Sequence, residues 1–241
     1  MKIVGVIPAR GNSERTKKKN TKIFCGRPLI AWTILSALKS KKLDRVIVST
    51  DSSEIAKIAR RYGAEVPFLR PPELATATIG IEPVMKHVYE WLKAKESYSA
   101  DALALLFCTN PLRQSWHIDE AIKIMKKTGC DSVVAVNETP ANHTPYWTLT
   151  QDKKGKVSLF GGIPLKKIIN RRQDFPEKCY ARNEIIYLLK PKNLYEKPSR
   201  LYGQKVELYV TNPIYEVDIN TPEEWQLAEI RFKNLSKLKA P

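Results

Sequence analysis

The N-terminal segment IVGVIPARGNSERTKKKN, residues 3–20, decides the predicted fold. Its first five residues are apolar and predict a buried strand. The loop that follows contains glycine and serine, with only Glu14 opposing its cations. The next segment, PLIAWTILSALKS at 28–40, has a proline at its start and is typical of a helix. In α/β proteins such a strand, loop and helix commonly bind phosphate at the carboxyl end of the strand. The loop cations are Arg10, Arg15, Lys17, Lys18 and Lys19.

The chain up to residue 137 continues to alternate apolar strands with helical patterns. Strands are expected at 45–50, 65–69, 101–108 and 131–136, and helices at 52–63, 82–95 and 117–129. Continuous apolar strands separated by amphipathic helices predict a mostly parallel sheet that is covered on both faces. Two later strands are expected at 184–190 and 205–210. A last helix is expected to start at Thr221-Pro222-Glu223-Glu224, which has the pattern of a capping box.

The alternation stops between residues 138 and 180, where Pro, Gly, Lys and aromatic residues are frequent. Two short β-like pieces, 146–150 and 157–160, flank QDKKGK, which is typical of a hairpin turn. We interpret 138–180 as an insertion into one α/β domain that is formed by 1–137 and 181–241.

The composition is that of a globular protein with a strongly basic balance. Apolar residues make up 43% and charged residues 27% of the 241 residues, and the formal net charge is +16. This charge favours anionic partners: nucleic acid, a membrane surface, or phosphorylated and carboxylated small molecules. The N-terminal apolar run is too short for a signal peptide, and no run of about 18 apolar residues predicts a membrane helix. The four cysteines lack CxxC spacing, so we expect reduced thiols in a cytoplasmic protein.

The basic loop lacks the two common phosphate-binding signatures, GxxxxGK[ST] and GxGxxG. Gly11 would let the backbone approach a phosphate closely. Arg10, Arg15 and Lys19 would neutralise a triphosphate. The alternative is a solvated basic loop without a ligand.

Several ordered motifs resemble those of the cytidylyltransferases that activate sialic acid and related nonulosonic acids. PARGNSERTKKKN resembles the signature loop PARGGSKRIPRKN, and GRPLIAWTI at 26–34 resembles GKPLIAYTI. LLFCTNPLR at 105–113 is similar to LLQPTSPLR, and VDINTPEEW at 217–225 to a metal-binding IDTPED-like segment. The resemblance implies a Rossmann-like three-layer nucleotidyltransferase fold with an inserted dimerisation subdomain. It also implies a homodimer that couples CTP to an acidic 2-keto sugar, giving a CMP-sugar and pyrophosphate.

The resemblance also implies which residues bind the nucleotide. Lys19 is the leading candidate to stabilise charge at the α-phosphate, with Arg10 beside it, whereas Lys17 and Lys18 are expected to be solvated neighbours. Arg70 has the alternative of an ordinary surface arginine. Asp51 would support the loop or help to place the metal, and its minimum role is that of N-cap for the helix at 52–62. The expected nucleotide-binding set is Arg10, Gly11, Ser13, Arg15, Lys19, Asn20, Asp51 and Arg70.

Asp218 is the expected catalytic carboxylate and the main ligand of Mg²⁺, which prefers oxygen ligands. The family has a second aspartate two residues later, where this chain has Asn220, whose amide oxygen would be an uncharged ligand. In a strand, Glu216 would share their face. The alternative for these three residues is a solvent-facing edge strand. The expected sugar-side residues are Thr109, Asn110, Arg113, Arg172, Asn183 and Tyr187, with a structural role as the alternative for Arg113.

Departures from the family pattern concentrate on the base and sugar sides. Phe107 and Cys108 replace a Gln-Pro pair, and Ile81 stands where a serine normally meets the cytosine. A related nucleotidyltransferase with another base or sugar therefore remains an alternative. A non-catalytic or nucleic-acid-binding relative is the alternative from another class. It predicts a steep loss of affinity with salt, and no aromatic-and-basic RNA-binding signature supports it.

Overall fold

The computed structural model describes residues 1–12 and 18–238 of the chain, with side chains up to Leu235. The expected site residues Ser13 and Arg15, and Lys17, expected as a solvated neighbour, lie outside the described residues. The chain divides into two compact units, Met1–Ala135 with Asn183–Pro241, and Val136–Arg182. The sequence placed these boundaries at 138 and 180. Within the described part, no helix is long and apolar enough to cross a membrane.

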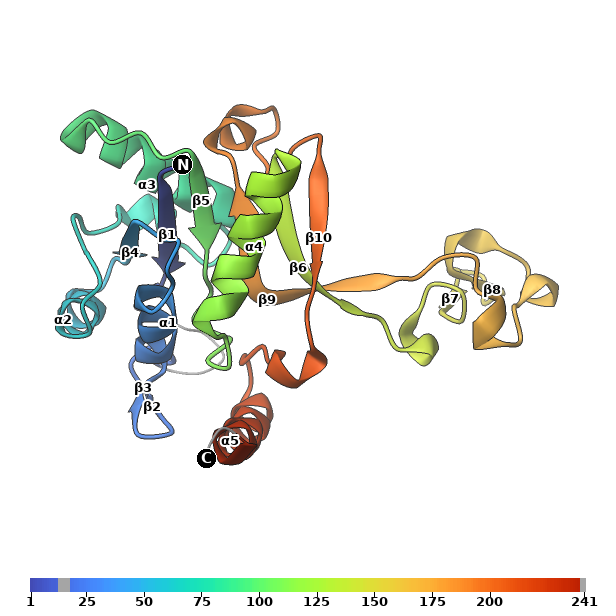
Figure 1. The fold of residues 1–241 in the computed structure, drawn as a ribbon. Helices are drawn as coiled ribbons and strands as arrows, with labels where there is room; N and C mark the ends of the chain where they lie inside the picture. The colour runs from blue at the N-terminus through green and yellow to red at the C-terminus, as the bar shows by residue number, and fades with distance from the viewer. Residues whose placement is uncertain (13–17, 239–241) are drawn as a thin grey trace. The chain divides into compact units, whose positions relative to one another are not determined.

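The larger unit is built on a six-stranded sheet with the order β10-β6-β9-β5-β1-β4 (Figure 1). β1 is parallel to β4 and β5, whereas β9 is antiparallel to β5 and places Tyr187 opposite Leu105. The carboxyl ends of β1, β4 and β5 therefore meet at one edge of the sheet. The strands are β1 (Ile3–Pro8), β4 (Arg45–Ser49), β5 (Ala102–Leu105), β6 (Ser132–Glu138), β9 (Tyr180–Leu189) and β10 (Val206–Val210).

Helices cover both faces of this sheet. α1 packs against α2 and α4 on one face, and α3 contacts β1 on the other (Figure 1). The core between these layers is apolar, with Ile7, Ile34, Val48, Leu106 and Ile118 almost completely buried. Removing such side chains from water is the main force that holds the layers together. The helices are α1 (Leu29–Leu38), α2 (Ser53–Arg61), α3 (Ile81–Glu96), α4 (Ser115–Thr128) and α5 (Pro222–Leu238).

A second apolar cluster attaches the C-terminal part of the chain to this body. Val217, Ile219 and Trp225 pack with Phe24 and Leu112. The ring centroids of Phe24 and Trp225 lie 5.5 Å apart in an edge-on arrangement, which aromatic pairs favour. Short elements complete the unit: β2 (Ile23–Phe24), β3 (Arg27–Pro28), and the 3₁₀ turns η1 (Pro72–Leu74), η6 (Pro191–Tyr195) and η7 (Pro213–Tyr215).

Three local predictions were wrong. The strand expected at 65–69 is reduced to a single bridge between Ile47 and Glu65, because Pro67 has no N–H to continue the ladder. The N-cap of α2 is Ser52, which accepts from the Ile55 N–H, and not Asp51. Residues 216–220 form no strand in the described structure, although Val217 and Ile219 are buried and Asp218 is exposed.

The smaller unit contains the expected hairpin, formed by β7 (Leu149–Gln151) and β8 (Val157–Leu159). Its aromatic residues pack around Phe175, with the ring centroids of Tyr146 and Trp147 at 4.8 and 5.1 Å. Phe160 is 56% exposed. The unit has four 3₁₀ turns among its described elements: η2 (Ala141–His143), η3 (Phe160–Gly162), η4 (Leu165–Lys167) and η5 (Arg172–Asp174).

Candidate active site

The basic loop after β1 is closed by Asn20. This side chain is buried and donates from Nδ2 to the carbonyl oxygen of Arg10 at 3.1 Å. The Asn20 carbonyl accepts from the N–H of Ile30 at 3.0 Å, near the start of α1. Asn20 therefore joins the two ends of the loop to the helix. The structure thus gives Asn20 a structural role, and its contact with a nucleotide stays a prediction. Lys18 is exposed, as predicted, and its ammonium lies 3.4 Å from Glu54.

Gly11 and Asp51 anchor the other side of the loop. Oδ1 of Asp51 accepts the Gly11 N–H at 2.8 Å. A Cβ on Gly11 would lie 2.9 Å from Cβ of Ser52, closer than carbon atoms normally approach. Gly11 is thus required here by the approach of α2, a reason that the sequence did not indicate.

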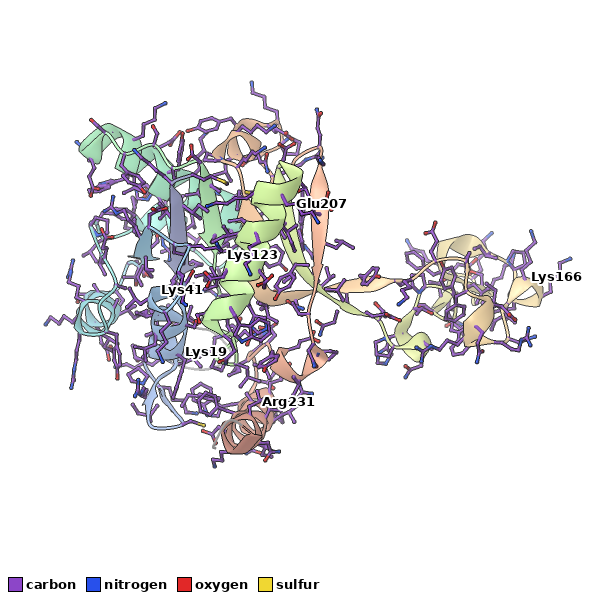
Figure 2. The ribbon with its side chains drawn as sticks, in the orientation of Figure 1. Lys19, Lys41, Lys123, Lys166, Glu207 and Arg231 are labelled. Atoms are coloured by element: carbon purple, nitrogen blue, oxygen red, sulfur yellow. The ribbon has the colours of Figure 1, made fainter. Side chains whose placement is uncertain are left out.

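Lys19 reaches the segment that carries Asp218. Its Nζ donates to the carbonyl oxygen of Ile219 at 2.7 Å and lies 3.4 Å from Oδ1 of Asn220. Burial lowers the pKa of Lys19, the nearby Asp218 carboxylate opposes this effect, and Arg10 adds to it. Asp218 and Arg10, which the sequence placed in the catalytic centre with Lys19, therefore both lie within electrostatic range of Lys19. Figure 2 shows Lys19 among the side chains of this unit.

Thr109 and Asn110, which follow β5, hold the Asp218 segment to the sheet edge. The Thr109 carbonyl accepts from the Ile219 N–H at 3.0 Å. Asn110 is completely buried, donates from Nδ2 to the Tyr215 carbonyl at 3.1 Å, and accepts from the Leu112 N–H at 3.0 Å. Both residues support the site through these backbone contacts.

The residues around Asp218 fit a Mg²⁺ ion that brings most of its ligands with it. Within the described residues, no group of three or more His, Cys, Asp or Glu side chains could hold a metal. Asp218 is exposed, and its Oδ2 accepts from Nδ2 of Asn220 at 2.7 Å. The amide oxygen of Asn220, expected as a ligand, is directed to Lys19. One carboxylate suits a Mg²⁺ shell completed by phosphate oxygens and water.

Arg10 and Arg70 line one cavity at the ends of β1 and β4. Arg70 is 6% exposed, so the alternative of a surface arginine is wrong. Its guanidinium donates to the Ser49 hydroxyl at 3.2 Å and to the Leu74 carbonyl at 3.3 Å, and burial lowers its pKa. The other cavity walls include Thr76, Ala77, Ile79, Ile81 and Phe107.

The expected sugar-side residues divide between the two units. Arg113 is 2% exposed, and its guanidinium donates to the carbonyls of Phe107, Ile185 and Glu184 and to the Thr33 hydroxyl. These contacts support the structural alternative for Arg113, whose pKa burial lowers to about 10. Nδ2 of Asn183 donates to the Thr211 hydroxyl at 2.8 Å, and Tyr187 lies edge-on to Phe107. Arg172 belongs to the smaller unit, where it lines a cavity with Lys178 and Glu138.

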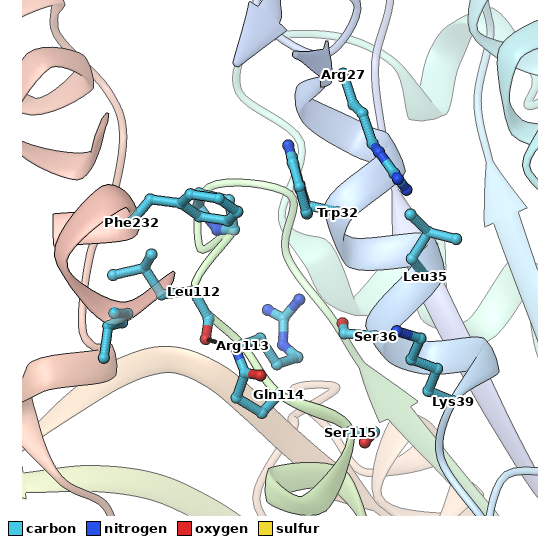
Figure 3. A pocket seen from close by; sticks show the side chains of 12 residues that line it. Arg27, Trp32, Leu35, Ser36, Lys39, Leu112, Arg113, Gln114, Ser115 and Phe232 are labelled. Carbon is cyan, nitrogen blue, oxygen red and sulfur yellow. Dashed lines mark hydrogen bonds between the residues drawn. The ribbon is translucent and has the colours of Figure 1, made fainter. Parts of the chain in front are cut away.

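A further cavity lies between α1, the loop at 111–115 and α5 (Figure 3). Trp32 and Phe232 contribute aromatic rings whose centroids are 4.5 Å apart, and Arg27 and Lys39 contribute cations. Among the expected site residues that the structure describes, only Arg113 lines it.

The sequence analysis missed two residues that line the cavity of Arg10 and one residue that caps α4. Thr76 and Ile79 line the Arg10 cavity, and the only signal for them was the unusual segment LATATIGI at 74–81. His117 lies in the first turn of α4. It is buried, and its Nδ1 accepts from the N–H of Gln114 in the capping box of α4. The spacing of Gln114 and His117 alone carries no strong signal for this cap.

Comparisons with known proteins identify the family of the chain. The family model described as Cytidylyltransferase matches residues 4–240. CMP-N,N'-diacetyllegionaminic acid synthase of Legionella pneumophila is 37% identical over 234 residues, which cover 95% of each chain. N-acylneuraminate cytidylyltransferase of Escherichia coli is 30% identical over 94% of this chain, which spans 51% of that longer relative.

Solved structures share the fold. CMP:2-keto-3-deoxy-manno-octonic acid synthetase complexed with CTP superposes with a TM-score of 0.69 at 15% identity, covering 98% of this chain and 100% of that chain. 4-diphosphocytidyl-2C-methyl-D-erythritol synthase from Anaerococcus prevotii gives a TM-score of 0.64 at 14% identity, covering 96% and 98%. These likenesses confirm the predicted Rossmann-like nucleotidyltransferase fold. With the family model and the full-length relatives, they establish that the chain belongs to the cytidylyltransferase family.

Proposed function

We propose that the protein couples CTP to a nonulosonic acid and releases a CMP-sugar and pyrophosphate. The observation that carries this proposal is the convergence of Lys19, Arg10 and Asp218 at the carboxyl ends of parallel strands. The names of the relatives supply the substrate class, since two of them refer to legionaminic acid and to acylneuraminate.

In this reaction the anomeric hydroxyl oxygen of the sugar forms a bond to the α-phosphorus of CTP. The bond from the α-phosphorus to the β-phosphate oxygen breaks, pyrophosphate leaves, and the hydroxyl proton is released. Such transfers depend mainly on positioning and on stabilising spread negative charge. The hydrogen bond to the Ile219 carbonyl holds the Lys19 ammonium in one place, and Arg10 adds a second cation on the same loop.

Asp218 would hold a Mg²⁺ ion, which neutralises phosphate charge and orients the triphosphate when bound. The other residues have supporting roles. Asp51 and Asn20 keep the loop closed for the nucleotide. Thr109 and Asn110 keep Asp218 at the strand edge.

The cavity lined by Arg10 and Arg70 is the proposed place of the cytosine. Ile81 and Phe107 make its wall more apolar than a serine and a glutamine would. Base recognition would then depend on stacking and on backbone groups more than on side-chain amides. This makes cytosine selectivity a property to measure with all four nucleotides.

A homodimer is proposed from the surface of the smaller unit. Six large apolar side chains there are at least 40% exposed, more than a unit of this size normally leaves in water. They are Leu149, Val157, Phe160, Ile163, Leu165 and Ile168. Reduced cysteines, all four of them free, and the use of CTP fit a cytoplasmic location.

The test is a panel that combines Mg²⁺, each of the four nucleoside triphosphates, and several 2-keto sugar acids. Pyrophosphate release with CTP and a nine-carbon sugar acid is the expected result. Asp218→Ala should lose this activity, whereas Asn212→Ala, at an exposed turn, should keep it. Folded protein that releases no pyrophosphate with any combination would overturn the proposal.

A further inference from the structure

The structure assigns to Asn220 the role of a positioning residue that makes divalent-cation binding conditional on the triphosphate. This inference rests on the proposed function, because it concerns the same Asp218 and Lys19. It differs from the expectation that Asn220 is itself a metal ligand.

The geometry of the Asn220 amide carries the inference. Its Nδ2 lies 2.7 Å from Oδ2 of Asp218, and its Oδ1 lies 3.4 Å from Nζ of Lys19. An ammonium group can only donate a hydrogen bond and an ionised carboxylate can only accept one. The two charged neighbours therefore determine which way the amide faces. Its oxygen points to the cation, and its NH₂ group points to the carboxylate.

The backbone of Asn220 is held as firmly as its side chain. Its N–H donates to Oε2 of Glu224 at 2.7 Å, and the Thr221 N–H donates to the same oxygen at 2.9 Å. The preceding residue, Ile219, is fully buried and bonded to the Thr109 carbonyl. The cap of α5 and the sheet edge thus fix the amide between Lys19 and Asp218.

Without a nucleotide, this arrangement provides few ligands for a divalent cation. Asp218 contributes one carboxylate, and Asn220 presents N–H groups to it where a second carboxylate would share the ion. The Lys19 ammonium is close enough to Asp218 to interact with it, so it opposes a nearby divalent cation. Affinity of oxygen sites for hard cations rises with the number of charged ligands. The free protein should therefore bind Mg²⁺ weakly.

A bound triphosphate makes the site favourable for a divalent cation. It supplies several anionic oxygens, and its charge offsets the Lys19 ammonium. Oδ1 of Asp218 makes no hydrogen bond to any described residue and can accept the ion that the nucleotide brings. The cation then enters with CTP. Before CTP binds, Asn220 keeps Asp218 and Lys19 aligned.

The experiment titrates Mn²⁺, followed by the electron paramagnetic resonance signal of the free ion, into the full chain with and without CTP. Asn220→Asp adds the second carboxylate and removes the donor. Asn212→Asp is the matched control, because Asn212 accepts from the Ile214 N–H at an exposed turn and aspartate keeps that acceptor. Asn220→Ala removes the bridge without adding charge.

Wild type and Asn212→Asp should bind Mn²⁺ weakly alone and at least about tenfold more tightly with CTP. Asn220→Asp should bind Mn²⁺ without CTP at least about tenfold more tightly than wild type. Asn220→Ala should lower kcat with little change in KM for CTP, since the bridge aligns groups that CTP can still reach. Nucleotide-free Mn²⁺ affinity that is equal in wild type and Asn220→Asp would overturn the inference. So would nucleotide-free binding in wild type as tight as binding with CTP.

The role of Asn220 and the proposed function can be disproved independently of each other. The nucleotide-free titration requires no turnover, so it decides the role of Asn220 even if the pyrophosphate assay is silent. Pyrophosphate release by a protein that binds Mn²⁺ equally well with and without CTP would leave the proposed function standing and remove the inference about Asn220.

Discussion

Asn110→Ala tests how the Asp218 segment is held. The change removes a completely buried side chain that donates to the Tyr215 carbonyl and accepts from the Leu112 N–H. Leaving the buried Leu112 N–H without this partner costs about 1–3 kcal/mol, and losing the bond to Tyr215 costs about 1 kcal/mol. We therefore expect the free energy of unfolding to fall by about 2–4 kcal/mol. For a chain of this length, that lowers Tm by about 5–15 °C.

Asn212→Ala is the matched control for this change. Asn212 makes the same local bond, accepting from the N–H two residues later, but its side chain is exposed. Water replaces that bond, so Tm should change by about 2 °C or less. Thermal unfolding followed by circular dichroism measures both variants, and kcat/KM for CTP at a temperature below both transitions should fall only for Asn110→Ala. Equal Tm values for the two variants would show that the buried contacts of Asn110 do not hold this segment.

Three other predictions concern the loop, the pH dependence of stability and thiol reactivity. Gly11→Ala should raise KM for CTP, because its Cβ would clash with Cβ of Ser52, and adding Ser52→Gly should restore it; a double variant as impaired as the single one would contradict this cause. The hydrogen bond from Lys192 lowers the pKa of Asp131 to about 2, so its stabilising contribution is present above pH 3.8 and is lost as the pH falls towards 2. Asp131→Asn should flatten the dependence of unfolding free energy on pH in that window, and an unchanged slope would disagree. Burial raises the pKa of Cys108 to about 12, so mass spectrometry should find Cys108 alkylated only after unfolding and not in the native protein at pH 8.

The sequence predicted the alternating strands and helices because continuous apolar segments and helical periodicity reflect burial directly. The position of the basic loop after the first strand indicated a phosphate site at the carboxyl edge of the sheet. Only the resemblance to the cytidylyltransferases placed Asp218 with Lys19 and Arg10. The sequence also predicted the large insertion from a change in composition.

Other features depend on contacts between distant residues, which no local pattern records. The support given by Asn110 to Tyr215 spans 105 residues of chain, and the bond from Lys19 to Ile219 spans 200. Ser52 is the N-cap of α2 because the Asp51 carboxylate accepts the hydrogen bond from the Gly11 N–H instead. N-cap propensity alone does not distinguish Asp51 from Ser52, since both residue types are good caps.

We propose that Lys19 and Arg10 receive the triphosphate while Asp218 receives its metal ion. A crystal structure of the protein with CTP and Mn²⁺, in which anomalous scattering locates the ion, tests this most directly. We expect Mn²⁺ at the Asp218 carboxylate, with phosphate oxygens completing its shell and Lys19 beside the α-phosphate. A nucleotide and ion bound elsewhere, for example in the cavity of Trp32 and Phe232, would contradict it.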